Sequence, residues 1–251
     1  MSTTAAGWTP FVIALILSYL IGSIPFAYII VRLVTGEDIT THGTGNVGSM
    51  NVRRTTGSWG WFGLAVLGDG LKGLVPVAIA KWLGGLPVLV PYSQGVAMMA
   101  AQRTVVSFPP PTMANGWIYL LANPLPLLAV FGAVLGHNYS FWMALIEHKF
   151  TRTGKGLATG AGALLAYDWR YLVAALLVAL IVIAITRYMM AGQVAAAFAL
   201  PLAALATRSF DWSFALFMGL IVYAAHHKRF VGLLQGKEPK LYINDSMGPR
   251  G

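Results

Sequence analysis

The chain has 251 residues, of which 57% are hydrophobic and 10% are charged, and it carries a formal net charge of +9. Ordinary soluble domains carry about 25% charged residues. This composition therefore excludes a soluble domain and predicts an all-α membrane protein. The sequence has no cysteine, which excludes disulfides and thiolate ligands. Its histidines form no HExxH pair and its acidic residues are scattered singly, so we expect no metal and no cofactor. No segment interleaves basic with aromatic residues, so we expect no nucleic-acid partner.

Apolar stretches divide the chain into the spans of one polytopic membrane domain, 1–251. The first ten residues contain no Lys or Arg. They lack the basic start of a signal peptide, so we expect the apolar stretch after them to be retained as a span. The short stretch 157–167 is either a tilted crossing or one half of a long broken helix, and the polar tail 228–251 is expected outside the bilayer. The seven transmembrane helices are predicted at 11–34, 60–83, 117–142, 157–167, 171–189, 192–207 and 212–227.

Residues 84–116 are moderately apolar and are flanked by proline breaks, which fits a short span, an interfacial helix or a re-entrant piece. The distribution of Lys and Arg residues among the loops favours a segment 84–116 that does not cross the membrane. Without a crossing there, 12 of the 17 Lys and Arg residues share one side of the membrane, and such an excess marks the cytoplasmic side. The N-terminus is then outside. The twelve residues are Arg32, Arg53, Arg54, Lys149, Arg152, Lys155, Arg187, Lys228, Arg229, Lys237, Lys240 and Arg250.

The first polar segment on that side is HGTGNVGSMNVRRTTG, residues 42–57. Its glycines allow positive φ and a close approach of the backbone to a ligand. Inward-facing N–H groups can form an anion nest, and a neighbouring arginine can clamp a phosphate. Taken alone, the segment also fits a solvated, glycine-rich connector.

Two further polar segments face the same side. In TGKGLATGAG, residues 153–162, Lys155 lies between two glycines at a predicted helix start, which favours phosphate. A basic loop held by lipid headgroups is the alternative. In HHKRFVGLLQGKEPK, residues 226–240, His226 fits a general base, a phosphate ligand or a histidine at a helix C-terminus.

Asp69 and Lys72 stand inside a predicted span, on one face of its helix, where they can form an ion pair. Charged residues inside a membrane usually line an interior cavity. An ion pair that only fixes helix packing is the alternative.

The chain resembles the acyl-phosphate-dependent glycerol-3-phosphate acyltransferases of bacterial membranes over nearly its whole length. The family's first motif, SGNxGxTNxxRxxG, is matched by Thr44, Gly45, Asn46, Gly48, Asn51, Arg54 and Gly57. The second, GHxFP followed by GGKGxAT, is matched by Gly136, His137, Tyr139, Gly154, Lys155, Gly156, Ala158 and Thr159. The third, HRxNIxRLxxGxE, is matched by His226, Leu233, Gly236 and Glu238.

The chain departs from this pattern at a few positions. Thr44 replaces Ser and keeps a hydroxyl, whereas Met50 replaces Thr and removes one. Thr153 stands in place of the first glycine of GGKG. In the third motif Arg229 stands where Asn is expected and Gly232 where Arg is, and Arg229 can supply the charge that Gly232 lacks.

The resemblance implies seven transmembrane helices in the bacterial inner membrane, with the site at the cytoplasmic face. It also implies acyl transfer from acyl phosphate to the 1-hydroxyl of glycerol 3-phosphate, which gives lysophosphatidic acid, the first step of phospholipid synthesis. We expect a monomer. Arg54 and Lys155 are implied as phosphate clamps, and His226 as a ligand of glycerol phosphate or an aid to its deprotonation. The implied substrate-binding residues are Thr44, Gly45, Asn46, Gly48, Asn51, Gly154, Gly156, His137, Arg229 and Glu238.

Two other functions stay open from the residues alone. One is a small transporter for an anionic metabolite, which the Asp69–Lys72 pair favours, although no repeat halves are visible. The other is a lipid-binding relative without catalysis, which Met50, Arg229 and Gly232 favour.

Overall fold

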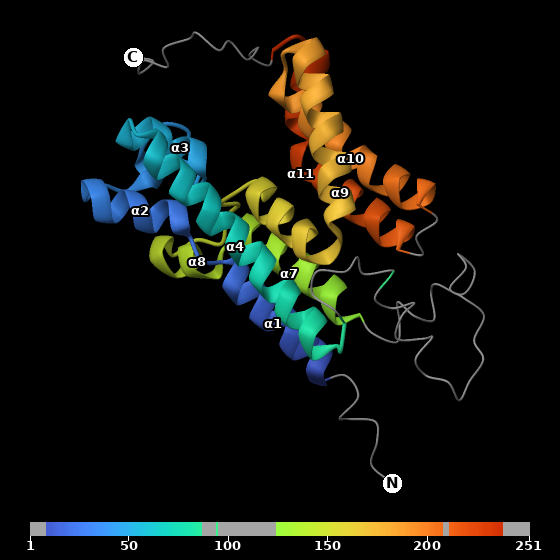
Figure 1. Cartoon of the computed structure of the whole chain (residues 1–251). Helices are drawn as coiled ribbons and strands as arrows, with labels where there is room; N and C mark the ends of the chain where they lie inside the picture. Colours follow the sequence, from blue (N-terminus) through green and yellow to red (C-terminus); the bar gives the residue numbers. More distant parts are fainter. Residues whose placement is uncertain (1–8, 87–93, 95–123, 208–210, 238–251) are drawn as a thin grey trace, which may run out of the picture. The chain divides into compact units, whose positions relative to one another are not determined.

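The computed structural model describes residues 9–86, 94, 124–207 and 211–237, without the side chains of Ala225, His226, Lys228 and Arg229. All the regular elements in this part are helices (Figure 1), so the predicted all-α class is confirmed. They fall into two compact units. The described residues up to Leu86 and from Pro124 to Tyr167 form the first unit, and those from Asp168 onward form the second. Most of 84–116 lies outside the described residues.

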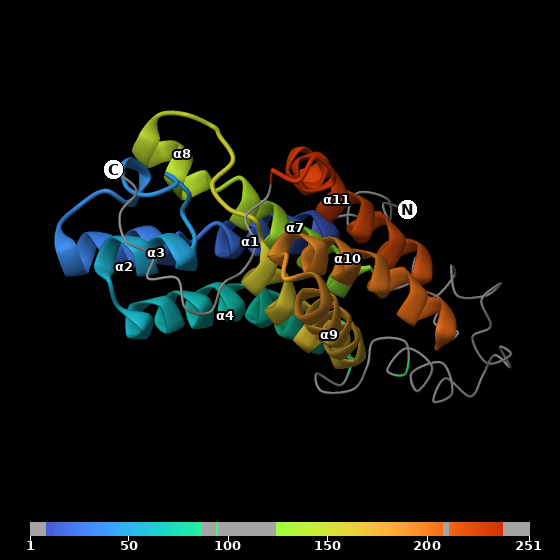
Figure 2. The same cartoon turned by 90° about the horizontal axis from the view of Figure 1, so that it is seen from above.

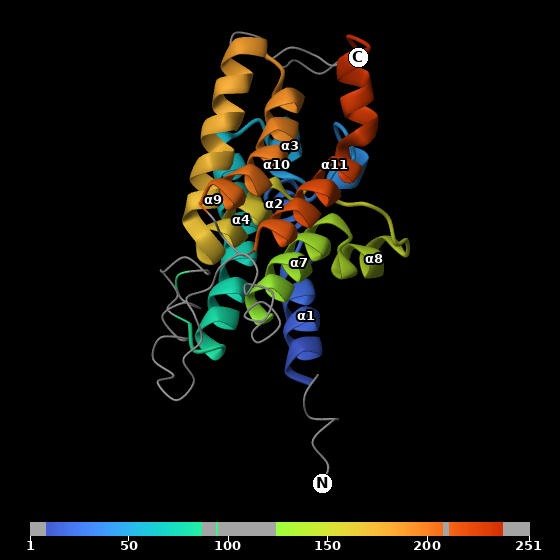
Figure 3. The same cartoon turned by 90° about the vertical axis from the view of Figure 1, so that its right-hand side faces the viewer.

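The predicted first span is built from two helices, α1 (Thr9–Gly22) and α2 (Phe26–Thr35). Pro25 lies in the break between them, because proline has no N–H to continue the helical hydrogen bonds. Helix α7 (Leu125–Asn138) packs along α1 (Figure 3). Small residues permit this approach: a Cβ added to Gly132 would lie 2.8 Å from a backbone oxygen of α1.

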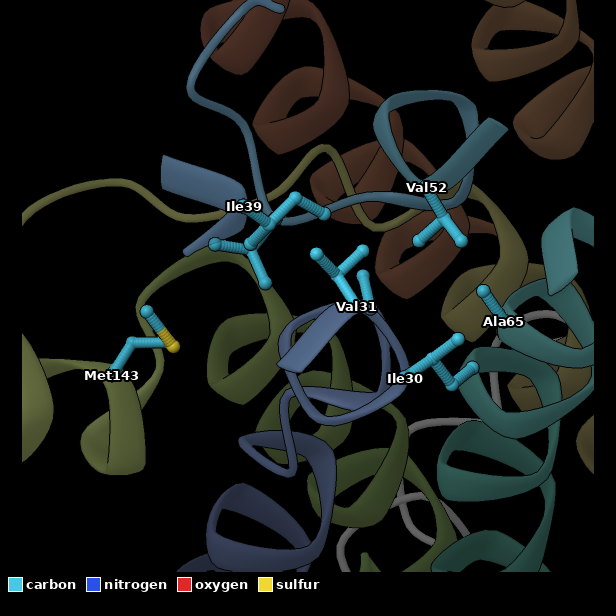
Figure 4. Close-up of a cluster of buried hydrophobic side chains, with 8 residues drawn as sticks. Ile30, Val31, Ile39, Val52, Ala65 and Met143 are labelled. Atoms are coloured by element: carbon cyan, nitrogen blue, oxygen red, sulfur yellow. The ribbon is translucent and has the colours of Figure 1, made fainter. Parts of the chain in front are cut away.

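The end of the first unit next to α2 carries the first polar segment. A short 3-10 helix (Ile39–Thr41) leads to α3 (Ser49–Thr56), which ends at Gly57 with a φ of 71°. Helix α4 (Trp59–Leu83) follows, and the Ser58 hydroxyl caps its first turn. Figure 2 shows α2, α3 and the start of α4 together. Their apolar faces meet in a cluster that includes Ile30, Val31, Ile39, Val52, Ala65 and Met143 (Figure 4).

Helix α8 (Phe141–Glu147) precedes the second polar segment, and α9 (Leu157–Thr186) begins within it. The backbone of α9 leaves helical geometry at Asp168, where φ is −156° and ψ is 102°. This break lies between the predicted stretches 157–167 and 171–189. Lys81 supports the first half, since its Nζ donates to the carbonyl oxygens of Ala166 at 2.8 Å and Tyr167 at 3.4 Å.

The second unit contains the rest of α9 together with α10 (Met189–Ala206) and α11 (Trp212–Leu234), which pack against each other. The Tyr171 hydroxyl donates to the Asp211 carboxylate at 2.5 Å. Helix α11 extends past its predicted end at 227, because apolar residues follow the basic group of HHKR.

Five stretches of the described chain are long and apolar enough to cross a membrane, and Trp212–Ala224 is a shorter apolar helix. The predicted number of seven spans is therefore approximate. The five stretches are Thr9–Thr35, Trp59–Leu83, Leu125–Glu147, Leu157–Thr186 and Met189–Ala206.

Candidate active site

The first polar segment begins with a loop, residues 42–48, whose shape depends on the side chain of Asn51. Asn51 is 2% exposed, and its Nδ2 donates to the carbonyl oxygens of Ile39 at 3.1 Å and His42 at 2.9 Å. Its Oδ1 accepts the N–H of Thr44 at 3.3 Å. The sequence predicted Asn51 as a substrate-binding residue. Its polar atoms are instead bound to the loop backbone, so we assign it to holding the loop.

The loop glycines shape this turn. Gly43 and Gly45 have φ angles of 56° and 67°, where a residue with a Cβ is strained. The N–H groups of Gly45 and Gly48 donate to the carbonyl oxygens of His42 at 2.9 Å and Asn46 at 3.0 Å. These two N–H groups therefore have partners within the loop, and the role of Gly45 and Gly48 in substrate binding stays a prediction.

Arg53 and Arg54 are adjacent in sequence but lie in different environments. The guanidinium carbon of Arg53 is 4.9 Å from the centroid of the Trp59 ring, a cation–π contact. The Arg54 side chain is exposed, and its Cδ would lie 3.5 Å from a Cβ on Gly43, so its stem runs across the loop. Within the described part of the chain, the Arg54 guanidinium has no hydrogen-bond or ion-pair partner. This geometry favours Arg54 over Arg53 as an anion ligand.

The second polar segment is joined directly to the first. The N–H of Val47 donates to the carbonyl oxygen of Thr153 at 2.9 Å. The Thr153 hydroxyl donates to the carbonyl oxygen of His137 at 2.9 Å, and its N–H donates to that of Asn138 at 2.9 Å. Thr153 thus makes a side-chain contact that the family's usual glycine cannot make, and its φ is not positive.

Lys155 lies two residues further on and is half-buried. Gly154 packs against the His137 ring, because a Cβ there would overlap the Nε2 atom. Gly156 has a φ of 74° and turns the chain into the first residues of α9. The ring of His137 is buried behind this loop. We therefore assign His137, which the sequence predicted to bind substrate, to supporting the loop.

The two loops together bring chemically suitable side chains to one end of the first unit. The first loop offers the exposed Thr44 and the half-buried Asn46, and α3 beside it offers the exposed Arg54. The second offers Lys155. Two cations with a hydroxyl and an amide can hold phosphate groups and orient a reacting hydroxyl.

The third polar segment belongs to the second unit. His226 and Arg229 lie on α11, but their side chains are outside the described set, and Glu238 lies outside the described residues altogether. Their predicted roles remain predictions.

Ser140, which the sequence did not single out, contacts the second polar segment: its N–H donates to the Thr153 hydroxyl at 3.3 Å. Its hydroxyl donates to the carbonyl oxygen of Ser23 at 2.5 Å, in the break between α1 and α2. It also accepts the N–H of Met143 at 3.1 Å as the cap of α8. A serine directly before an apolar helical stretch is the sequence signal that points to such a cap.

Comparisons with known proteins agree on one family. The sequence profile described as Glycerol-3-phosphate acyltransferase matches residues 12–236. A Glycerol-3-phosphate acyltransferase of Acaryochloris marina is 31% identical over 233 residues, which cover 91% of each chain. Glycerol-3-phosphate acyltransferase 2 of Moorella thermoacetica is 36% identical over 190 residues, or 75% of each chain.

The fold is similar to a crystal structure of PlsY (YgiH), an integral membrane glycerol 3-phosphate acyltransferase, in its glycerol 3-phosphate form. The TM-score is 0.66 and the sequence identity 25%, over 93% of this chain and 96% of that one. The chain therefore belongs to the glycerol-3-phosphate acyltransferase family, and it is an integral membrane enzyme.

Proposed function

We propose that this enzyme transfers a fatty acyl group from acyl phosphate to the 1-hydroxyl of glycerol 3-phosphate, giving lysophosphatidic acid and phosphate. The observation that carries the proposal is the hydrogen bond from Val47 to Thr153. It joins the loop beside Arg54 to the loop that carries Lys155. The relatives named above and the PlsY structure solved with glycerol 3-phosphate support the choice of acceptor.

The proposed reaction requires little beyond the positioning of the two substrates and the stabilisation of their negative charge. An acyl phosphate is an activated anhydride, so neither a covalent enzyme intermediate nor a metal is required. The hydroxyl oxygen attacks the carbonyl carbon, the bond from that carbon to the phosphate oxygen breaks, and phosphate leaves with the electron pair. The hydroxyl proton goes to His226 or to a phosphate oxygen of the substrate. Holding two anions with these atoms aligned supplies most of the rate enhancement.

The residues divide into groups by their proposed roles. Arg54 and Lys155 clamp the phosphates, while Thr44 and Asn46 orient the reacting groups. Gly154 and Gly156 let the second loop approach the substrate closely. In the third segment, His226 and Arg229 bind glycerol phosphate, and Glu238 anchors that segment.

The orientation in the membrane follows from the loop charge. The N-terminus lies outside, and the three polar segments face the cytoplasm, where glycerol 3-phosphate is soluble. We further propose that the enzyme acts as a monomer in the bacterial inner membrane.

The test is a direct assay. The purified protein in detergent is incubated with acyl phosphate and labelled glycerol 3-phosphate, and the lipid fraction is analysed for labelled lysophosphatidic acid. Formation of that product at a rate proportional to the amount of protein supports the proposal. No product from folded protein contradicts it. In that case, saturable uptake of glycerol 3-phosphate into proteoliposomes identifies a transporter, and binding of acyl phosphate alone identifies a non-catalytic relative.

A further inference from the structure

An ion pair lies inside the apolar helix α4. The Oδ1 of Asp69 is 2.7 Å from the Nζ of Lys72, and each side chain is 4% exposed. Charged groups are costly to bury in a membrane helix and are mostly found there at functional positions. The proposed chemistry uses neither residue, so the pair needs another explanation.

Lys72 is fixed by a second acceptor. Its Nζ also donates to the carbonyl oxygen of Ile24 at 2.7 Å, and Ile24 lies in the break between α1 and α2. Because two acceptors hold the ammonium group, Lys72 fixes in turn the position of the Asp69 carboxylate.

Asp69 connects the pair to the second polar segment. Its Oδ1 is 3.7 Å from the Nδ1 of His137, which is 3.0 Å from the hydroxyl of Thr159. On the other side of the ring, Nε2 lies against Gly154. The imidazole therefore contacts the chain on both sides of Lys155, at Gly154 before it and at Thr159 after it. All these residues belong to the first unit.

We propose that Asp69 and Lys72 are positioning residues for acyl transfer: they hold the His137 ring, and the ring holds both sides of the Lys155 loop. This inference rests on the proposed role of Lys155. The Asp69 carboxylate is too far from Nδ1 for a hydrogen bond, but its negative charge favours a proton on that nitrogen, which can then donate to the Thr159 hydroxyl and hold the ring. Without Asp69 the ring loses this constraint. A misplacement of about 1 Å at a catalytic group can lower a rate about 100-fold.

The first test compares Asp69→Asn, Lys72→Met and the double variant. Each single change leaves a buried charge unpaired, so we expect a lower Tm. The double variant buries no charge, so we expect its Tm to return close to that of the wild type. Its kcat is nevertheless expected to stay about 10-fold or more below the wild type, because the carboxylate no longer acts on the His137 ring. If the pair only holds helices together, Tm and kcat will recover together in the double variant, which would overturn the inference.

The second test acts on the other end of the network. Thr159→Val removes the hydroxyl that contacts Nδ1 while keeping the shape, and Thr159→Ser keeps that hydroxyl. We expect the valine variant to lose about 10-fold in kcat and the serine variant much less. Thr186→Val is the control, because the Thr186 hydroxyl is also bonded within the protein but not to His137: it donates to the carbonyl oxygen of Val182 at 2.6 Å and accepts the N–H of Tyr188 at 3.2 Å. Equal losses in the valine and serine variants at Thr159 would contradict the inference.

A third measurement does not depend on activity. Hydrogen exchange in peptides covering residues 152–160 is expected to be faster in the folded double variant than in the wild type, with no change in α10. Unchanged exchange there would overturn the inference even in an active enzyme. Conversely, a wild type that makes no lysophosphatidic acid contradicts the proposed function, while the exchange result still decides whether the ion pair holds the loop.

Discussion

The carboxamide oxygen of Asn51 accepts the backbone N–H of Thr44, and its nitrogen donates to two further backbone carbonyls of the same turn. Asn51→Leu keeps the branching of the side chain at Cγ but removes all three bonds. Each buried group left unpaired costs about 1–3 kcal/mol, so we expect a lower Tm in detergent. We also expect a loss of turnover measured per folded protein, because Thr44 moves. A variant with wild-type Tm and turnover would show that the loop holds its shape without Asn51.

The neighbouring arginines offer a matched pair of substitutions. Arg54→Ala removes the exposed guanidinium proposed to clamp phosphate, and we expect kcat/KM to fall by about 100-fold or more. Arg53→Ala removes the group that stacks on Trp59, and we expect a change of less than about 3-fold, since that contact is a surface cation–π pair. The measurement is the rate of lysophosphatidic acid formation by each purified variant. A reversed order of the two effects would reassign the clamp to Arg53.

The sequence predicted the helical class, the membrane character and the residues of the two adjoining loops. These follow from local signals, namely apolar length, glycine spacing and basic charge. It could not predict that a hydrogen bond between Val47 and Thr153 joins the two loops, because nothing in residue type marks a backbone contact across about a hundred positions. The break of the first span at residues 23–25 was also missed, although Pro25 is a local signal for it.

Residues that hold a site were harder to separate from residues that bind a ligand. Asn51 and His137 belong to the same motifs as Arg54 and Lys155, so a motif match treats all four alike. Their burial divides them. The side chains of Asn51 and His137 are buried and bonded within the protein, whereas Arg54 is exposed. Accessibility depends on the tertiary fold and is not encoded in the spacing of the motif.

Lys155 can be tested against Lys149, which lies six residues earlier in the chain. Lys155→Ala is expected to lower kcat by about 100-fold or more, because it removes the charge that we propose lies beside the departing phosphate. Lys149→Ala removes an exposed charge, and we expect the activity to be retained. Both variants are assayed with acyl phosphate and labelled glycerol 3-phosphate after their Tm values have been compared. Full activity in folded Lys155→Ala would remove this residue from the proposed mechanism.

Two glycines close to each other in sequence should respond in opposite ways to alanine. At Gly154 a Cβ would overlap the His137 ring, so Gly154→Ala must displace either the ring or the loop that carries Lys155. We expect most of the activity to be lost, with a lower Tm. At Gly160, in the first turns of α9, a Cβ meets nothing within 4 Å. Gly160→Ala should therefore keep its activity and gain up to about 1 kcal/mol of helix stability. Equal turnover by the two folded variants would mean that contact between Gly154 and His137 does not set the position of Lys155.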